Sequence, residues 1–152
     1  MEDSKEPEQP EGGLGHHAVT VVIRNRGSSV CVLSGVPTLE FVDAANQPLA
    51  VTVCQNCDAY LFRSQPVREI HVGPKSPAYV VVAYNINNGA EGDLVCRNAL
   101  ALRLYLPGQS EPLKSRLGQG RDGIRSCGPV DVTPFLEKPL SDGFLADPAY
   151  RQ

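Results

Sequence analysis

The sequence predicts an all-β domain, and three features of the chain indicate this class. Apolar runs of strand length are separated by turn residues from residue 16 to residue 134. Val19, Val21 and Ile23 occupy alternate positions, which is the period of a half-buried strand. No part of this region holds apolar residues at the i, i+3, i+4, i+7 spacing of an amphipathic helix. Because 152 residues suffice for a single core, we expect one domain.

Each expected strand ends at residues that favour turns. Gly, Pro, Asn and Ser fill the intervening positions, and each sets a turn through its backbone freedom, its fixed φ or its side-chain hydrogen bonding. Residues 78–84 are apolar on both faces, as expected for a central strand covered by the opposite sheet and by a loop. Eight or nine short strands in this length indicate a two-sheet sandwich. The expected strands are His17–Asn25, Val30–Leu33, Thr38–Asp43, Leu49–Cys54, Val67–Val72, Ala78–Asn85, Leu100–Leu106, Leu113–Leu117 and Val130–Thr133.

The two ends of the chain differ in composition from the middle. Residues 1–15 are acidic and rich in Pro and Gly, which is typical of a disordered leader or linker. We assign residues 16–134 to the sandwich and residues 135–152 to an irregular tail, partly packed through Phe135 and Phe144. The leader has no basic region followed by an apolar stretch, so it is not a signal peptide.

The cysteine content indicates an oxidising compartment. Five cysteines, Cys31, Cys54, Cys57, Cys96 and Cys127, are more than a small cytosolic protein without metal usually carries. We therefore expect an extracytoplasmic protein that is secreted, periplasmic or lipid-anchored. The signal or anchor is expected to precede Met1 in the precursor, with the acidic leader as the linker that follows it.

Two disulfides and one free thiol are expected. Cys96 and Cys127 each precede one of the last strands, so a bond between them would hold these strands together. Cys31 is then expected to pair with Cys54 or Cys57, and we favour Cys54 because it ends a strand and is more fixed. Cys57 is left as the free thiol that an odd number of cysteines requires.

Cys54 and Cys57 are also the only pair in the chain with a spacing known from redox and metal sites. In redox proteins such a pair opens a helix, whereas here Pro66 follows too soon for one to form. A zinc site needs a second pair or two histidines, and His16 and His17 are adjacent, so in a strand they point to opposite faces. Metal binding or redox activity is therefore the alternative and not the main hypothesis.

Composition and motifs disfavour several classes of function. A net charge of −3, an aromatic content of 6% and the absence of Trp disfavour nucleic-acid binding, which depends on basic surfaces and on aromatic rings for base stacking. No apolar run reaches the roughly 18 residues that span a bilayer. The sequence contains no nucleophile elbow, no zinc-protease motif and no calcium-binding loop. We therefore expect a protein that is not an enzyme and that needs no cofactor.

Several spaced motifs resemble the domain of unknown function 4232 family of exported bacterial proteins. The resemblance implies an immunoglobulin-like antiparallel β-sandwich, export, and no assigned activity or catalytic residue. Many relatives carry a cysteine before the first strand, which this chain lacks, and often have none in the loop that holds Cys54 and Cys57, so disulfide connectivity does not carry over. The motifs are Asn25-x-Gly27-Ser28-x-x-Cys31-x-Leu33-x-Gly35-x-Pro37, Phe41-Val42-Asp43-Ala44, Pro48-Leu49, Val72-Gly73-Pro74-x-x-x-Ala78, Cys96 with Leu102-x-Leu104-x-Leu106-Pro107-Gly108, and the closing Cys127.

Two hypotheses about function follow. The first is a non-enzymatic extracytoplasmic module with a structural role or an unidentified protein partner, since sandwiches often present binding loops and edges. The second is a small-molecule or metal-binding domain, possibly redox-active, that uses Cys54 and Cys57. The first predicts at most one free thiol in the native protein, and the second predicts two reactive thiols or bound zinc.

Overall fold

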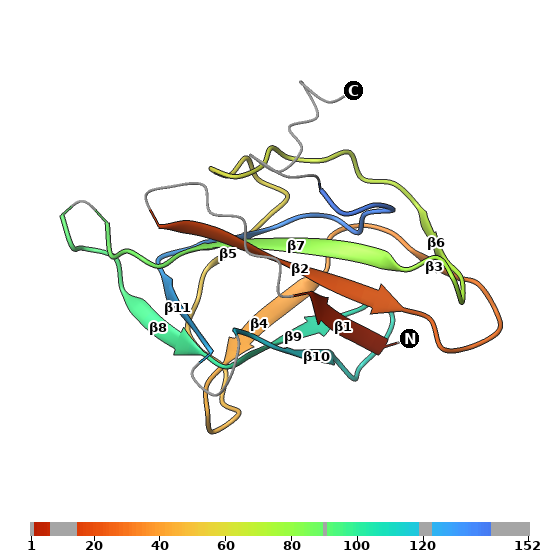
Figure 1. The fold of residues 1–152 in the computed structure, drawn as a ribbon, viewed down its shortest axis with the longest axis horizontal. Coiled ribbons are helices and arrows are strands. Elements are labelled where there is room, and N and C mark those ends of the chain that lie inside the picture. The colour runs from red at the N-terminus through yellow and green to blue at the C-terminus, as the bar shows by residue number, and fades with distance from the viewer. Residues whose placement is uncertain (1, 7–14, 90, 119–122, 141–152) are drawn as a thin grey trace.

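The computed structural model describes residues 2–6, 15–89, 91–118 and 123–140, and it is all-β (Figure 1). Within these ranges no helix is present, which confirms the predicted class. The strands are β1 Glu2–Glu6, β2 His16–Arg24, β3 Cys31–Leu33, β4 Thr38–Val42, β5 Val53–Gln55, β6 Ile70–Val72, β7 Ala78–Asn85, β8 Cys96–Ala99, β9 Ala101–Tyr105, β10 Leu113–Arg116, β11 Ile124–Cys127 and β12 Val130–Val132.

The strands form four sheets. The largest has the order β1-β2-β7-β12-β5, and a three-stranded sheet has the order β10-β9-β4. Two further pairs, β11-β8 and β3-β6, complete the described strands. Figure 1 shows β4, β9 and β10 on one side of the long strands β2 and β7. In the described part of the chain, no helix is long and apolar enough to cross a membrane.

The main core lies between the large sheet and the three-stranded sheet. Val21 of β2 and Val80 and Val82 of β7 pack in one buried cluster with Phe41 of β4 and Leu104 of β9. The residues of β2 and β7 share one face of the large sheet, and those of β4 and β9 share the facing side of the three-stranded sheet, because alternate residues of a strand point the same way. The alternation predicted for β2 is therefore confirmed for its core face.

We expect Val21→Ala to lower the free energy of unfolding by about 1–3 kcal/mol, through lost burial and a residual cavity. Val21 is fully buried, whereas the neighbouring Thr20 is only partly buried, so Thr20→Ala should have little effect. Urea unfolding of the two variants measures the difference. Equal losses would contradict the assignment of Val21 to the core face.

The opposite face of the large sheet is also covered, as the apolar run 78–84 predicts. Ala18 of β2 and Val81 and Ala83 of β7 pack there against Leu61 and Phe62 in a second buried cluster. Leu61 and Phe62 belong to the segment between β5 and β6, which Figure 1 shows in yellow on the side of β7 away from β4 and β9. We call residues 56–65 the covering segment.

The observed strands differ from the prediction in number and direction. There are more strands than the eight or nine expected, because β1, β8 and β11 are added. The predicted sandwich is purely antiparallel, whereas β12 pairs with β5 in parallel and with β7 antiparallel. A long stretch of chain separates β5 from β12, so no tight hairpin forces these two strands to run in opposite directions. The immunoglobulin-like connectivity stays a prediction.

The N-terminal end of the chain differs from the prediction, whereas the C-terminal end agrees with it at Phe135. Glu2–Glu6 forms β1 and pairs antiparallel with β2, where a disordered leader was expected, and residues 7–14 lie outside the described residues. At the other end, Phe135 is 1% exposed and packs in the main core, which confirms the packing predicted for this residue of the tail. Leu136 exchanges two backbone hydrogen bonds with Tyr79 of β7. Phe144 lies outside the described residues.

The Asn25-x-Gly27 motif has a structural explanation. The buried Asn25 donates from Nδ2 to the carbonyl oxygens of Ser29 and Val72, each at 2.7 Å. Its Oδ1 accepts a hydrogen bond from the backbone N–H of Gly27 at 2.9 Å. One side chain therefore holds the turn after β2 against β6, and its polar atoms are satisfied in a buried position.

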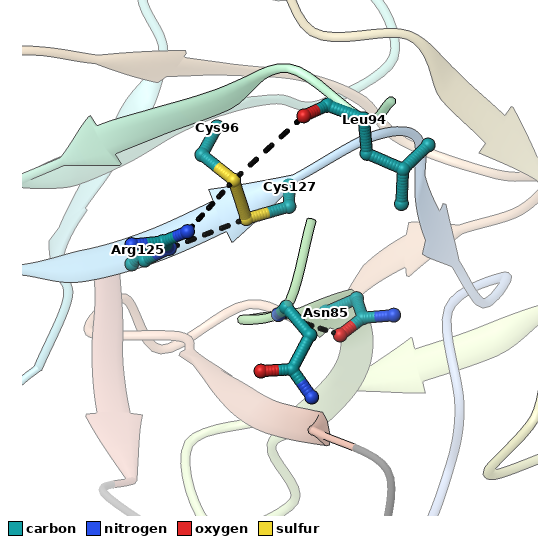
Figure 2. The surroundings of a disulfide bond; sticks show 6 residues. Asn85, Leu94, Cys96, Arg125 and Cys127 are labelled. Carbon is teal, nitrogen blue, oxygen red and sulfur yellow. Dashed lines mark hydrogen bonds between the residues drawn. A yellow bond between two sulfur atoms is a disulfide. The ribbon is translucent and has the colours of Figure 1, made fainter. Parts of the chain in front are cut away.

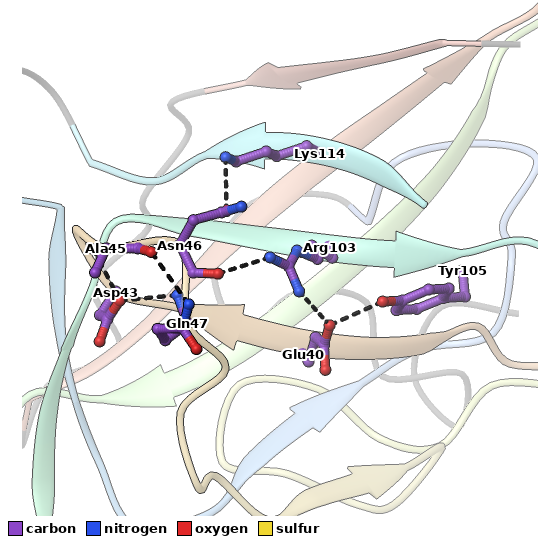
Figure 3. A network of polar contacts seen from close by, with 8 residues as sticks. All are labelled: Glu40, Asp43, Ala45, Asn46, Gln47, Arg103, Tyr105 and Lys114. Atoms are coloured by element: carbon purple, nitrogen blue, oxygen red, sulfur yellow. Dashed lines mark hydrogen bonds and ion pairs between the residues drawn. The ribbon is translucent and has the colours of Figure 1, made fainter. Parts of the chain in front are cut away.

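The outer face of β4 and β9 carries a polar network (Figure 3). Glu40 accepts hydrogen bonds at Oε1 from the Arg103 guanidinium at 2.9 Å and from the Tyr105 hydroxyl at 2.8 Å. Arg103 also donates to the carbonyl oxygen of Asn46, and Lys114 donates to the Asn46 side chain. Asn46 has a φ of 62°, so these bonds hold the tight turn after β4 in place.

Arg103, and then Tyr105, lower the pKa of Glu40 below its ordinary value of 4.5 through their hydrogen bonds. A lowered pKa in the folded state stabilises the fold above the unfolded pKa, and this contribution is lost as the pH falls through the folded pKa. We expect Glu40→Gln to cost up to about 1 kcal/mol at pH 7, since the carboxylate is partly screened by solvent. Urea unfolding at neutral pH and well below pH 4.5 should show this difference shrinking in acid, and a constant difference would contradict the assignment.

Candidate functional site

Cys54 and Cys57 form a disulfide at the start of the covering segment. Cys54 lies in β5, and Asn56 after it adopts a φ of 56°, a left-handed conformation that asparagine tolerates. This turn brings the two Cα atoms to 5.8 Å, within the usual range for a disulfide. The Asn56 side chain then hydrogen-bonds the backbone of Gln65 through both Oδ1 and Nδ2. The covering segment is therefore closed on itself and attached to the edge of the sheet.

The predicted Cys31–Cys54 bond is wrong. Cys31 is a free, half-buried thiol, and Cys57, expected to be free, is bonded to Cys54. The physical reason is the topology: Cys31 lies in β3, opposite Val72 of β6, whereas Cys54 is at the end of a different sheet beside β12. The signal missed in the sequence is Asn56, because a left-handed residue between two cysteines allows a tight local turn.

The Cys96–Cys127 bond forms as predicted (Figure 2). The two cysteines lie directly opposite each other in the antiparallel pair β8-β11, and Cys127 is buried. The Arg125 guanidinium lies 3.4 Å from the Cys127 sulfur and 3.3 Å from the Cys96 sulfur. This bond joins two strands of the fold, and it differs in position and surroundings from the Cys54–Cys57 bond.

Asp131 lies beside the Cys54–Cys57 disulfide. It is opposite Cys54 in the parallel pair β12-β5 and opposite Ala83 in the pair β12-β7, so its side chain leaves the sheet on the covered outer face. One carboxylate oxygen and the two sulfurs lie within 4.8 Å of one another. Burial raises the pKa of Asp131 above its ordinary value. Because the two sulfurs are bonded to each other, they are not the thiolates that zinc requires.

A pocket of about 330 Å³ adjoins Asp131. The covering segment supplies Ala59, Tyr60 and Leu61 to its wall, and Leu94 and Pro129 line it from other parts of the chain. The ring of His16 stacks on Tyr60 at a centroid distance of 4.1 Å. Burial, and then the neighbouring His17, lower the pKa of His16, so this imidazole is more often neutral than an exposed one. The pocket is therefore largely apolar with a few polar groups, as small-molecule sites often are.

The histidine pair behaves as the strand geometry predicts. His16 stacks on Tyr60 at the covering segment, whereas His17 stacks on Tyr84, which packs in the main core. The two imidazoles therefore belong to opposite faces of β2 and do not converge on one ion. The sequence did not reveal Asp131 or Tyr60 as site residues. Asp131 reaches the cysteine pair through the pairing of β12 with β5, and Tyr60 reaches His16 from the covering segment, so both contacts depend on the tertiary fold.

Comparison with known proteins identifies a family but no activity. The family model described as a domain of unknown function (DUF4232) matches residues 6–136 of the chain. A search of curated proteins and a search of solved structures found no match. The matched range contains the strands from β2 to β12, both disulfides and the pocket. The chain belongs to the DUF4232 family.

Proposed function

We propose that this chain is a non-enzymatic module that acts outside the cytoplasm, where its immunoglobulin-like sandwich binds a protein partner. The observation that carries the proposal is the Cys96–Cys127 disulfide, which links two strands of the fold. Disulfides of this kind persist in secreted and periplasmic proteins and are rare in a reducing cytosol. Such a bond also stabilises a small domain, because it restricts the unfolded chain.

Exposed apolar side chains support a role in protein binding. Val32 of β3 and Val30 just before it are more than half exposed, and residues two apart in a strand share a face. β3 pairs with β6 alone among the described strands, so no described strand occupies its second edge. An extended partner segment with apolar side chains fits such an edge, because backbone hydrogen bonds and side-chain contacts form together.

The compartment is tested by trapping thiols in the producing cells with acid and then alkylating them. We expect Cys96 and Cys127 to resist alkylation until a reductant is added, and we expect protease outside the cytoplasmic membrane to degrade the protein. A protein that resists this protease and has both cysteines alkylated at once would overturn the proposal.

Partner binding is tested with a photo-crosslinking residue at Val32 and a matched one at Lys114, an exposed site on β10. We expect a discrete protein adduct from position 32 and none from position 114. Equal adducts, or none from position 32, would contradict binding at β3.

The pocket beside Asp131 favours a second candidate function, the binding of a small apolar or aromatic molecule. The stacked pair His16–Tyr60 offers a flat wall, and Leu61 and Leu94 offer apolar contacts. A panel of aromatic fragments followed by NMR tests this candidate. Shifts that cluster at these residues and vanish in Tyr60→Ala support it, whereas shifts elsewhere or none oppose it.

A further inference from the structure

The two disulfides of the described residues occupy different environments. Cys54 and Cys57 are three positions apart and both are half-buried, whereas Cys96 and Cys127 are 31 positions apart and Cys127 is buried. A bond that closes so short a loop restricts the unfolded chain least, so it contributes least to stability. The Cys54–Cys57 bond is therefore the one that the fold can open without losing a link between distant strands.

A carboxyl group lies next to this bond, whereas the side chain described beside the other bond is a guanidinium. One oxygen of the Asp131 carboxylate lies within 4.8 Å of both sulfurs. At Cys96–Cys127 the neighbouring side chain is instead the Arg125 guanidinium, which does not exchange a proton near neutral pH.

The groups around Asp131 determine its protonation. Ala83 faces it from β7, Cys54 faces it from β5, and His16, Tyr60 and Tyr84 line the adjoining pocket. Burial alone raises the pKa of Asp131, so the carboxyl keeps its proton to a higher pH than an exposed aspartic acid. A carboxyl of this kind can give a proton to a departing thiolate and take it back from the thiol.

We propose that Cys54–Cys57 is a redox-active disulfide that exchanges with an external thiol, and that Asp131 is the proton donor and acceptor for Cys54. This activity goes beyond partner binding and does not depend on it. In other redox proteins the N-terminus of a helix stabilises the thiolate of such a pair. Here the Asp131 carboxyl would instead give a proton to the Cys54 thiolate, so no helix is needed.

The exchange balances as two thiol–disulfide steps. A thiolate attacks the Cys57 sulfur, which lies in the covering segment; a new S–S bond forms and the Cys57–Cys54 bond breaks. The electron pair leaves on the Cys54 sulfur, and protonated Asp131 gives it a proton. A second external thiolate then attacks the external sulfur of the mixed disulfide. This step forms a disulfide between the two external sulfurs and releases Cys57 as a thiolate. Overall, two external thiols are oxidised and the protein disulfide is reduced to a dithiol.

The proposal is tested on the purified native protein with dithiothreitol, by quenching with acid, alkylating and measuring each cysteine by mass spectrometry. We expect Cys54–Cys57 to be reduced at least about tenfold faster than Cys96–Cys127 in the same molecules. Equal rates for the two bonds, or a slower rate for Cys54–Cys57, would overturn the redox proposal.

The role of Asp131 is tested with Asp131→Asn and with Glu40→Gln as a matched carboxyl-to-amide control away from the disulfide. After correction for the thiolate fraction of dithiothreitol, the native rate should fall as the pH rises through the pKa of Asp131. Asp131→Asn should be about tenfold slower at low pH and should lose this titration, while Glu40→Gln keeps it. An unchanged pH profile in Asp131→Asn would reject the assignment. If the variant merely loosened the fold, both disulfides would be reduced faster, which would equally count against a proton-donor role.

Discussion

Replacing Phe135 by Ala should lower the free energy of unfolding by about 3–5 kcal/mol, the loss expected when a buried aromatic ring is truncated in a well-packed core. Phe135 follows β12 and is among the most buried large side chains of the described residues. Its backbone N–H donates to the carbonyl oxygen of Gly35 at 3.1 Å, so its main chain is fixed to a distant part of the chain while its ring packs in the main core. Urea unfolding measures the loss.

Two further variants separate this result from a general sensitivity of the chain. Phe135→Leu keeps most of the apolar volume and should cost clearly less than Phe135→Ala. Val32→Ala removes an exposed side chain and should change stability by no more than about 0.5 kcal/mol. If Phe135→Ala matched Val32→Ala, the packed fold would end at residue 134 and the contacts of Phe135 would contribute little.

The sequence was sufficient for the long, regularly patterned strands. β7 begins and ends at the predicted residues, and the alternation in β2 correctly identified Val21 and Ile23 as core residues. These strands are predictable because each carries enough apolar residues in one period to outweigh local preferences. β8 and β11 have the polar sequences CRNA and IRSC, so their pairing depends on tertiary contacts and their own pattern does not reveal it.

The candidate site was predictable only in part, because some of its contacts also depend on the tertiary fold. The spacing of Cys54 and Cys57 identified them as a pair of the kind found in redox and metal sites. The positions of Cys96 and Cys127, each before one of the last predicted strands, indicated the bond between them. Asp131 lies opposite Cys54 because β12 and β5, which are far apart in the sequence, pair in parallel. The residue pattern within either strand does not predict this pairing. The pairing of Cys54 with Cys57 depended on the left-handed turn at Asn56, which spacing alone does not specify.

Removing the Cys96–Cys127 bond should destabilise the protein more than removing the Cys54–Cys57 bond. The first closes a loop of 31 positions, for which chain entropy gives about 3–4 kcal/mol, and the second closes a loop of three, for which it gives about 2 kcal/mol. We expect this ranking from the double variants Cys96→Ala with Cys127→Ala and Cys54→Ala with Cys57→Ala, measured by urea unfolding without reductant. Alanine is suitable at the buried Cys127 because it leaves no unpaired hydroxyl there.

Comparing the two double variants also shows whether the Cys54–Cys57 disulfide is needed for the fold or can open without unfolding it. A disulfide that opens during function must be one that the fold tolerates losing, so the Cys54–Cys57 double variant should keep its far-ultraviolet spectrum and its main core. Loss of that bond frees the covering segment at its start, while the Asn56–Gln65 hydrogen bonds and the burial of Leu61 and Phe62 continue to hold it. If this variant lost as much stability as the Cys96–Cys127 variant, the covering segment would depend on its disulfide, and thiol exchange at Cys54–Cys57 would be incompatible with a folded domain.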